Sequence, residues 1–306
     1  MVRVFRVVAL DDVLAVVPEL RDALSVEPLA GGLTNVNYKV VSPRGAFVVR
    51  VSGKDTGLLA IDRENEAHNT RVAAETGVGA PFVAWLPEHD ALVLDFLVGE
   101  VMSPETLRRG DRLVAVARAC RRLHGGTPFL HDFDMFEIQR RYLGVVRERG
   151  FRLPDRYEEF EPQVRALEEA MRVRQEPSVP CNNDLLAENF IDCGGEMRLI
   201  DYEYSGNNEP SFELGNLWSE SNLTLAQLEQ LVAEYYGTPL VSKVARCRVW
   251  GLMSKYGWTL WGSIQDGISD LDFDFWAWAM EKYERAVAEF DGPDFERLLE
   301  DVRRTD

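Results

Sequence analysis

Short runs rich in apolar and β-branched residues, separated by turn residues, occupy much of the first hundred positions. Residues 26–41 contain two such runs on either side of a glycine pair, and residues 46–52 contain a third. Residues 81–86 and 91–96 form two more around a polar turn. The pattern predicts an antiparallel sheet in the N-terminal part of the chain.

Longer segments show apolar residues at helical spacing. The first covers residues 11–24, with Asp11 as a suitable N-cap. The second covers residues 61–76 and stops at Gly77. Beyond residue 98 the pattern is mostly helical, with early helices expected over 111–123, 134–149 and 157–173. A helical second part therefore follows the predicted sheet.

A predicted hairpin brings three polar side chains together. Two short strands between residues 189 and 202 are separated by a Gly-Gly turn, which is typical of a hairpin. That hairpin places Asn189 opposite Ile200 and Asp201 at its open end. Asp184 lies just upstream, in the loop that enters the same end.

This trio has the residue types that phosphoryl transfer from a magnesium nucleotide requires. Asp184 would orient the attacking hydroxyl and accept its proton. Asn189 and Asp201 would bind Mg²⁺, with Glu203 in or near the same set of ligands. An ordinary polar loop before a hairpin is the alternative interpretation, and the convergence of the three groups favours catalysis.

Residues 183–190 and 200–208 carry a family resemblance. Their sequences, Asn-Asp-Leu-Leu-Ala-Glu-Asn-Phe and Ile-Asp-Tyr-Glu-Tyr-Ser-Gly-Asn-Asn, resemble the signature of the choline/ethanolamine kinase family. That family belongs to the kinase-like small-molecule phosphotransferases, which include the aminoglycoside kinases. The resemblance extends from the glycine pair near residue 31 to the aromatic helix near residue 278.

The chain departs from the family pattern near the catalytic loop. Asn182 stands where the family usually has a His that supports the loop, and Asn can still donate a hydrogen bond. Glu213 stands where the family usually has Asp, and we expect it to support the loop and not to bind metal. His124 has no partner signal and is expected to be structural.

Several residues of the N-terminal part are expected to contact ATP. Gly31 and Gly32 let backbone amides approach the phosphates, and Thr34 and Asn35 add hydrogen-bond donors. Most Gly-Gly turns bind nothing, so this assignment depends on its context.

The resemblance adds further nucleotide contacts. It implies that Arg50, on the third strand, reaches the α- and β-phosphates with its planar guanidinium. Glu66 is expected to pair with Arg50, with Glu64 as the alternative partner. The backbone of Asp95 and Leu97 is expected to meet the adenine at a hinge between two lobes.

Aromatic residues near the C-terminus indicate a site for a cation. Trp258 and Trp261 are three residues apart and therefore share one helix face. Aromatic rings attract a weakly hydrated ammonium by roughly 0.5–2 kcal/mol per contact. Packing in the core is the alternative for these rings. The resemblance implies a box for the ammonium group that consists of Tyr204, Trp258, Trp261, Phe273 and Trp278, with Glu220 facing the cation.

Composition narrows the choice of partners. The 306 residues carry a formal net charge of −17, which argues against nucleic acid and suits a cationic substrate. No apolar run reaches the ~18 residues of a membrane span. Residues 1–6 alternate basic and apolar side chains like an edge strand and lack the features of a signal peptide. Four widely spaced cysteines suit reduced thiols in the cytoplasm.

Together these observations predict an α+β, protein-kinase-like fold with two lobes, residues 1–97 and 98–306. The expected reaction uses ATP and Mg²⁺ to phosphorylate a small amino alcohol, with choline favoured over ethanolamine. Two alternatives remain: a kinase for another hydroxyl substrate, such as an aminoglycoside or thiamine, and a non-catalytic ligand-binding relative. A homodimer is compatible with the sequence, which does not determine the oligomeric state.

Overall fold

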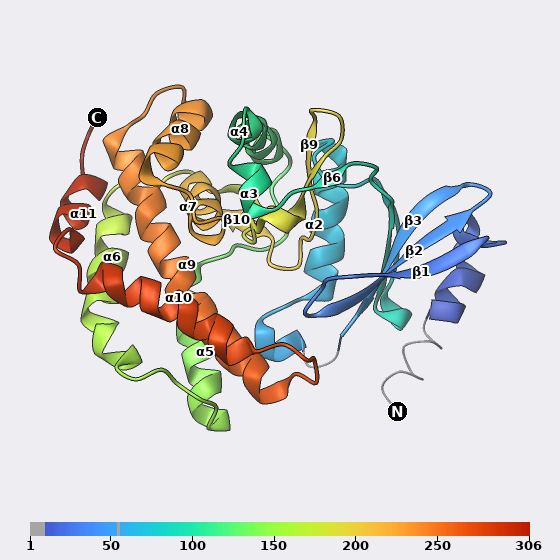
Figure 1. Ribbon diagram of the computed structural model, residues 1–306, viewed down its shortest axis with the longest axis horizontal. Coiled ribbons are helices and arrows are strands. Elements are labelled where there is room, and N and C mark those ends of the chain that lie inside the picture. Colours follow the sequence, from blue (N-terminus) through green and yellow to red (C-terminus); the bar gives the residue numbers. More distant parts are fainter. Residues whose placement is uncertain (1–9, 54–55) are drawn as a thin grey trace.

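The structure is a computed structural model that describes residues 10–53 and 56–306. The edge strand expected at residues 1–6 lies outside the described residues. An antiparallel sheet forms one end of the molecule, and helices dominate the rest (Figure 1). The expected α+β class is confirmed, whereas the lobe boundary at residue 97 stays a prediction.

The first predicted helix is shorter than expected. Residues 10–16 are helical, and Pro18–Leu20 form a separate 3₁₀ turn, η1. The second half of the 11–24 prediction was therefore wrong. Pro18 explains the error, because proline lacks a backbone N–H and its ring clashes with the preceding turn of a helix.

The N-terminal sheet has five antiparallel strands in the order β1-β2-β3-β5-β4. Val49 and Val93 are fully buried partners on β3 and β5, so one apolar face fixes the register of the sheet. The helix α2 (Arg63–Glu75) begins at Asp62, whose side chain accepts two backbone hydrogen bonds. The strands are Ser25–Leu29 (β1), Asn35–Ser42 (β2), Gly45–Ser52 (β3), Phe82–Leu86 (β4) and Ala91–Asp95 (β5).

Short strands organise the region between the sheet and the helices. The predicted hairpin is confirmed as β8 and β9, although β9 ends at Leu199, earlier than expected. Gly194 and Gly195 form its turn with φ angles of 74° and 93°, in the left-handed region that favours glycine. The strands are Glu100–Val101 (β6), Phe190–Asp192 (β8) and Met197–Leu199 (β9) in one sheet, and Val179–Cys181 (β7) and Gly206–Asn208 (β10) in another.

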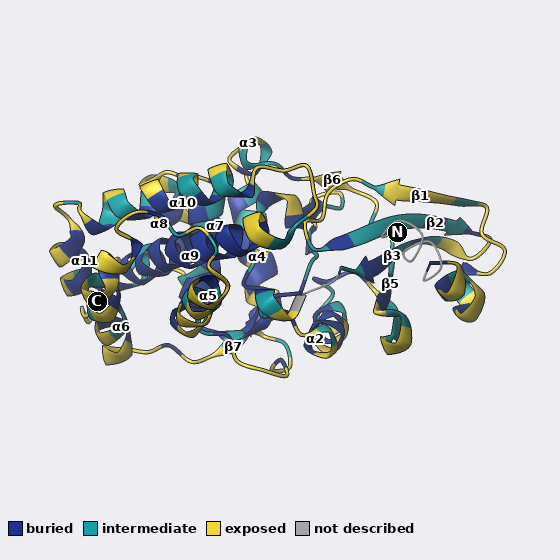
Figure 2. Cartoon of the chain, turned by 90° about the horizontal axis from the view of Figure 1, so that it is seen from below, coloured by how far each residue is buried: buried dark blue, intermediate teal, exposed yellow. Residues whose placement is uncertain are grey.

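Helix α9 (Val241–Ile268) is the central element of the helical part. It packs against α5, α7, α10 and α11 and is almost entirely buried between its ends (Figure 2). The other helices are Pro104–Leu107 (α3), Arg112–His124 (α4), Met135–Arg149 (α5), Glu161–Val173 (α6), Pro210–Glu220 (α7), Leu225–Tyr236 (α8), Phe275–Phe290 (α10) and Phe295–Val302 (α11). The 3₁₀ turns are Thr56–Leu59 (η2), Pro87–His89 (η3), Tyr157–Phe160 (η4) and Ala187–Asn189 (η5).

Two glycines let α7 and α9 cross at close range. A Cβ atom at Gly215 would overlap the carbonyl oxygen of Cys247 and lie 3.0 Å from the backbone nitrogen of Gly251. A Cβ at Gly251 would lie 2.8 Å from the carbonyl oxygen of Gly215. The contact between the two helices therefore requires that neither position has a side chain.

Across residues 10–53 and 56–306, no helix combines the length and the apolar character needed to cross a bilayer.

Candidate active site

Asn182 supports the catalytic loop from within. Its side-chain amide donates to the carbonyl oxygens of Ile200 (3.3 Å) and Asp201 (2.7 Å), and its Oδ1 accepts from the backbone N–H of Asp184 at 3.0 Å. Asn183 follows with a φ of 66°. The residue that replaces the usual loop His thus ties the loop to the open end of the hairpin.

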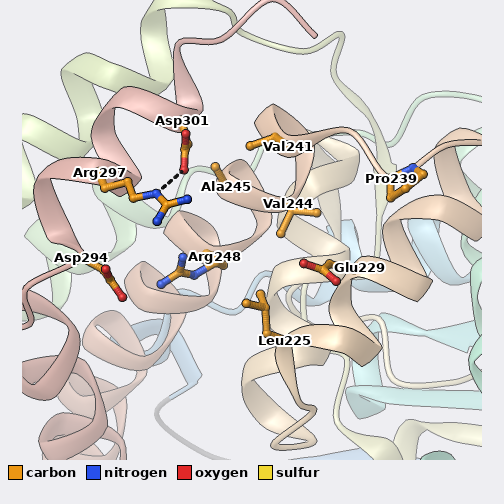
Figure 3. Close-up of a pocket in the computed structure, with 10 residues that line it drawn as sticks. All are labelled: Leu225, Glu229, Pro239, Val241, Val244, Ala245, Arg248, Asp294, Arg297 and Asp301. Carbon is orange, nitrogen blue, oxygen red and sulfur yellow. Dashed lines mark ion pairs between the residues drawn. The ribbon is translucent and has the colours of Figure 1, made fainter.

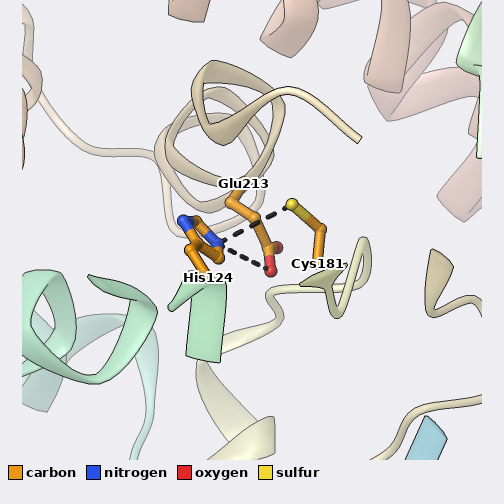
Figure 4. A group of neighbouring side chains, drawn as sticks. All are labelled: His124, Cys181 and Glu213. Atoms are coloured by element: carbon orange, nitrogen blue, oxygen red, sulfur yellow. Dashed lines mark hydrogen bonds and ion pairs between the residues drawn. The ribbon is translucent and has the colours of Figure 1, made fainter. Parts of the chain in front are cut away.

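A buried cluster of His124, Cys181 and Glu213 supports the loop from behind (Figure 4). Glu213 accepts hydrogen bonds from the backbone N–H groups of Asn182 (2.5 Å) and Asn183 (3.2 Å). Nε2 of His124 lies 3.6 Å from Oε1 of Glu213 and 3.7 Å from Sγ of Cys181. The carboxylate is already bound to the loop, as expected for a structural Glu213.

His124 brings to the loop an imidazole that the loop itself lacks. Its Nδ1 lies 2.7 Å from the hydroxyl of Tyr235, so both ring nitrogens have polar neighbours. The sequence identified His124 as structural but gave no partner, because α4 and the loop are 57 residues apart at this contact. The Glu213 carboxylate and both ring nitrogens of His124 already have polar neighbours within the protein. The cluster is therefore interpreted as support for the loop and not as a metal site.

The hairpin brings the predicted trio to one cavity. The backbone N–H of Ile200 donates to the carbonyl oxygen of Asn189 at 2.9 Å, which sets Asn189 beside Asp201. The side-chain amide of Asn189 donates to the backbone oxygen of Asp184 at 2.8 Å, and its Oδ1 remains available for a ligand. Asp184, Asn189 and Asp201 all line a cavity of about 310 Å³.

The charged residues that line this cavity, among those the structure describes, are all carboxylates. Burial raises the pKa of Asp184 well above its ordinary value, and the carboxylates of Asp201, Glu203 and Glu220 raise it further. Burial and then Asp201 raise the pKa of Glu203 to about 7, although Arg50 opposes the shift. Carboxylate and amide oxygens are the ligands that Mg²⁺ prefers, so Asn189, Asp201 and Glu203 fit this cation.

The raised pKa of Glu203 predicts a dependence of stability on pH in the metal-free protein. Between the ordinary value of 4.5 and about 7 the folded state holds a proton that the unfolded state releases. The free energy of unfolding therefore falls as the pH rises through this range, by about 3 kcal/mol at about 1.4 kcal/mol per pKa unit. Urea unfolding in EDTA at pH 5 and pH 7.5 measures it, and Glu203→Gln should remove most of this component. An equal fall in the variant would contradict the assignment.

Arg50 connects the sheet to the hairpin. Its guanidinium pairs with Glu66 at 2.8 Å and with Asp201 at 2.5 Å, so the expected partner is Glu66 and not Glu64. Burial alone would lower the pKa of Arg50, but Asp201, Glu66 and Glu203 reverse that effect and raise it. Arg50 therefore stays charged and is held against Asp201, one member of the trio.

Arg63 is a second cation beside Glu203 that the sequence analysis missed, and its side chain is only 10% exposed. Its Nη1 lies 2.6 Å from Glu66 and 3.4 Å from Glu203. Its position one helical turn before Glu66 was the available signal, since residues three apart on a helix are neighbours. Glu66 thus bridges two guanidinium groups.

The glycine turn reaches the same cavity from the sheet side. Gly31 and Gly32 line the cavity and have φ angles of 94° and 86°. Oγ1 of Thr34 donates to Glu203 at 2.8 Å, and the amide of Asn35 donates to Glu203 at 3.0 Å. The donors expected to face phosphate therefore bind the Glu203 carboxylate, just after the hairpin, in this structure.

The expected hinge residues lie at the end of β5. Among the described residues that line the 310 Å³ cavity, Asp95 and Leu97 are absent. The backbone N–H of Asp95 donates to the carbonyl oxygen of Pro81 at 2.9 Å, so this N–H is already engaged within the sheet. Their contact with adenine stays a prediction.

Four of the five expected aromatic residues form one wall of the cavity. Tyr204, Trp258, Trp261 and Trp278 line it. The rings of Tyr204 and Trp258 lie 4.9 Å apart, and those of Trp261 and Trp278 lie 5.2 Å apart. Nε1 of Trp261 donates to the hydroxyl of Tyr204 at 2.7 Å, which fixes both rings.

The fifth aromatic residue lies elsewhere. Phe273 is 43% exposed and packs against Phe275, with ring centroids 4.8 Å apart. It is absent from the described residues that line the cavity. The structure does not place Phe273 in the box, because the loop before α10 directs it outward while Trp278, one turn into the helix, faces inward.

Glu220 reaches the cavity, but it already has a cationic partner. Nζ of Lys282 lies 2.5 Å from Oε2 of Glu220 and 4.4 Å from the centroid of the Trp278 ring. The sequence analysis missed Lys282. The only local signal was its place four residues after Trp278 on one helix face.

A larger cavity of about 490 Å³ lies between α8, α9 and α11 (Figure 3). Its lining includes Arg248 and Arg297 together with Glu229, Asp294 and Asp301. It lacks the trio and the aromatic wall. Volume alone therefore does not identify the active site, and the smaller cavity is the better candidate on its chemistry.

Comparisons with known proteins give a family match. The sequence profile described as choline/ethanolamine kinase matches residues 26–240. Ethanolamine kinase 2 of Rattus norvegicus is 27% identical over 283 residues, which cover 82% of this chain and 72% of the relative.

Solved structures give the same picture. The crystal structure of a choline/ethanolamine kinase family protein from Mesorhizobium loti superposes with a TM-score of 0.85 at 32% identity, covering 96% of this chain and 99% of that one. The choline kinase LicA from Streptococcus pneumoniae superposes with a TM-score of 0.78 at 24% identity, covering 92% and 98%. The second likeness concerns the fold.

Proposed function

The chain belongs to the choline/ethanolamine kinase family, and from this premise we propose that it transfers the γ-phosphoryl group of ATP to the hydroxyl of a small amino alcohol. One observation carries the proposal: Asp184, Asn189 and Asp201 share a cavity with an aromatic wall. The first three residues suit phosphoryl transfer, and the wall suits an ammonium group.

Asp184 is the proposed base. As the substrate oxygen bonds to the γ-phosphorus and the bond to the β-phosphate oxygen breaks, the hydroxyl proton passes to the Asp184 carboxylate. Asn182 and Glu213 hold the loop, and thereby the carboxylate, in place. The products are ADP and a phosphate monoester.

Asn189 and Asp201 would hold Mg²⁺, with Glu203 beside them. When bound, the metal neutralises charge on the phosphates. The raised pKa values of Asp184 and Glu203 support this assignment, because a divalent cation supplies the positive charge that these buried carboxylates lack.

Arg50 is proposed to hold the phosphates of ATP. Glu66 and Asp201 fix its guanidinium near the trio, and Gly31 and Gly32 offer backbone amides on the other side. The use of ATP fits the cytoplasmic location expected from the sequence, which stays a prediction, as does the homodimer.

The choice between choline and ethanolamine is not decided by family membership, since the family includes kinases for both. The aromatic wall supports the preference for choline expected from the sequence. The ion pair between Glu220 and Lys282 instead supports ethanolamine, because it neutralises a charge that a quaternary ammonium would use.

A substrate panel tests the proposed function. ADP release is measured with choline, ethanolamine, thiamine and an aminoglycoside at saturating Mg-ATP. We expect turnover with the amino alcohols and little with the two larger compounds. Turnover with an aminoglycoside alone would favour the first alternative. Amine binding without ADP release would favour a non-catalytic relative.

Replacing Trp258 with alanine should weaken amine binding more than it lowers kcat. Loss of one ring face that contacts the ammonium, worth ~1–2 kcal/mol, raises KM for the amine by about 5- to 30-fold. Steady-state kinetics with the amine and with ATP as variable substrates measure the change. Trp276→Ala is the control, because that ring stacks on Arg152 and does not line the cavity. Equal KM values in both variants would remove Trp258 from the site.

A further inference from the structure

An ammonium group of the protein itself contacts two residues of the cavity wall, Glu220 and Trp278, although Lys282 is not one of the described residues that line the cavity. Nζ of Lys282 lies 2.5 Å from Oε2 of Glu220, and each side chain is only 4% exposed. The same Nζ lies 4.4 Å from the centroid of the Trp278 ring. Lys282 therefore uses both kinds of attraction, a carboxylate and a ring face, that an amine substrate would use.

This arrangement changes what Glu220 offers to a substrate. The charges of Glu220 and Lys282 cancel, so a cation in the box does not meet a free negative charge there. Nζ of Lys282 also repels a second cation placed against the same ring. A quaternary ammonium, which depends on charge and ring contacts alone, loses most from these two effects.

One oxygen of Glu220 remains without a partner. Oε1 is buried and accepts no hydrogen bond from the described residues, and Glu220 lines the cavity. A buried acceptor without a donor is unfavourable, and a ligand N–H directed at it removes that cost. A protonated primary amine can donate this hydrogen bond, whereas a trimethylammonium group has no N–H.

We propose that Lys282 is a specificity-determining residue that, by holding Glu220 and the Trp278 face, makes the cavity select ammonium groups with an N–H over quaternary ammonium. The inference rests on the proposed function and narrows it to ethanolamine-like substrates. Lys282 acts through Glu220 and Trp278, so it is a positioning residue and not one that contacts the reacting atoms.

A methylation series tests the proposal in the unaltered protein. Calorimetry measures the binding of ethanolamine, its N-methyl and N,N-dimethyl derivatives, and choline. We expect affinity to drop most steeply, by about tenfold, at the last methyl group, where the final N–H is lost. Choline binding as tightly as ethanolamine would overturn the proposal, and this outcome does not depend on any variant folding.

Lys282→Met tests the residue itself. The variant leaves Glu220 without its internal cation, so the ratio of kcat/KM for ethanolamine to that for choline should fall about tenfold. Lys255→Met is a matched control. Lys255 is buried, pairs with Glu289 and lies 5.0 Å from the Trp218 ring, but neither of these partners lines the cavity, whereas both partners of Lys282 do.

The two variants give distinct outcomes. An unchanged substrate ratio in Lys282→Met, or an equal change in Lys255→Met, would overturn the role of Lys282. Failure of every amine to release ADP in the unaltered protein would overturn the proposed function instead. In that case the calorimetric order of the methylation series would still decide whether the cavity selects an N–H.

Discussion

Replacing Asp184 with alanine is expected to lower kcat by about 1,000-fold or more while the fold stays intact. General base catalysis contributes ~10²–10⁴-fold, and Asp184 also orients the hydroxyl. The carboxylate accepts no hydrogen bond from the described residues, and the neighbouring carboxylates of Asp201 and Glu203 raise its pKa. Removing it relieves repulsion, so thermal stability should stay equal or rise. ADP release and a thermal melt measure the two effects.

Glu188 provides a control on the same loop. Its carboxylate also lines the cavity but is exposed, and it belongs to neither the trio nor its hydrogen bonds. Glu188→Ala should therefore retain kcat within about threefold, as is usual for a surface substitution. Near-normal turnover in Asp184→Ala would exclude Asp184 as the base. A large loss in Glu188→Ala would show that the loop tolerates no change and would make the first result uninformative about proton transfer.

Gly215→Ala is expected to give the largest loss of stability from a single methyl group. The added Cβ would overlap the carbonyl oxygen of Cys247, a backbone atom inside the buried helix α9. Overpacking usually costs ~1–3 kcal/mol, and a rigid backbone neighbour places this case at or above the upper end. Urea unfolding measures the free energy, and α7 and α9 should separate enough to disturb the Trp258 wall.

Gly144→Ala is the matched control for this prediction. Gly144 lies in α5, is exposed, and has open space where its Cβ would be. Alanine there should stabilise the helix by up to about 1 kcal/mol. If Gly215→Ala were as stable as Gly144→Ala, the close crossing of α7 and α9 would not exist as described.

The sequence analysis was most accurate for the three side chains of the trio, because a local hairpin brings them together. A Gly-Gly turn and two short strands predicted the hairpin that brings Asn189 beside Asp201. Asp184 is only five residues before Asn189 in the sequence. No distant part of the chain has to be placed for these three side chains to meet. The local pattern of residues was therefore enough to predict that these three side chains share one cavity, whereas their catalytic roles stay predictions.

The misses have three different physical causes. The 11–24 helix fails because Pro18 overrides an apolar pattern that continues past it. Phe273 is outward because it precedes α10, and helical spacing does not apply across that boundary. Lys282 and His124 find partners 62 and 111 residues away, and such contacts depend on how whole helices pack.

The hydrogen bonds to Glu203 have a consequence for how ligands arrive. Thr34 and Asn35 join the glycine turn to a residue 168 or 169 positions further along the chain. A metal ion held by Glu203 would compete with those two donors for the carboxylate oxygens, and a weaker hold on Glu203 would leave the turn freer to contact the phosphates. Binding of the metal and release of the glycine turn would then be coupled, so the turn should be held more firmly in the metal-free protein than in the protein with Mg²⁺ bound.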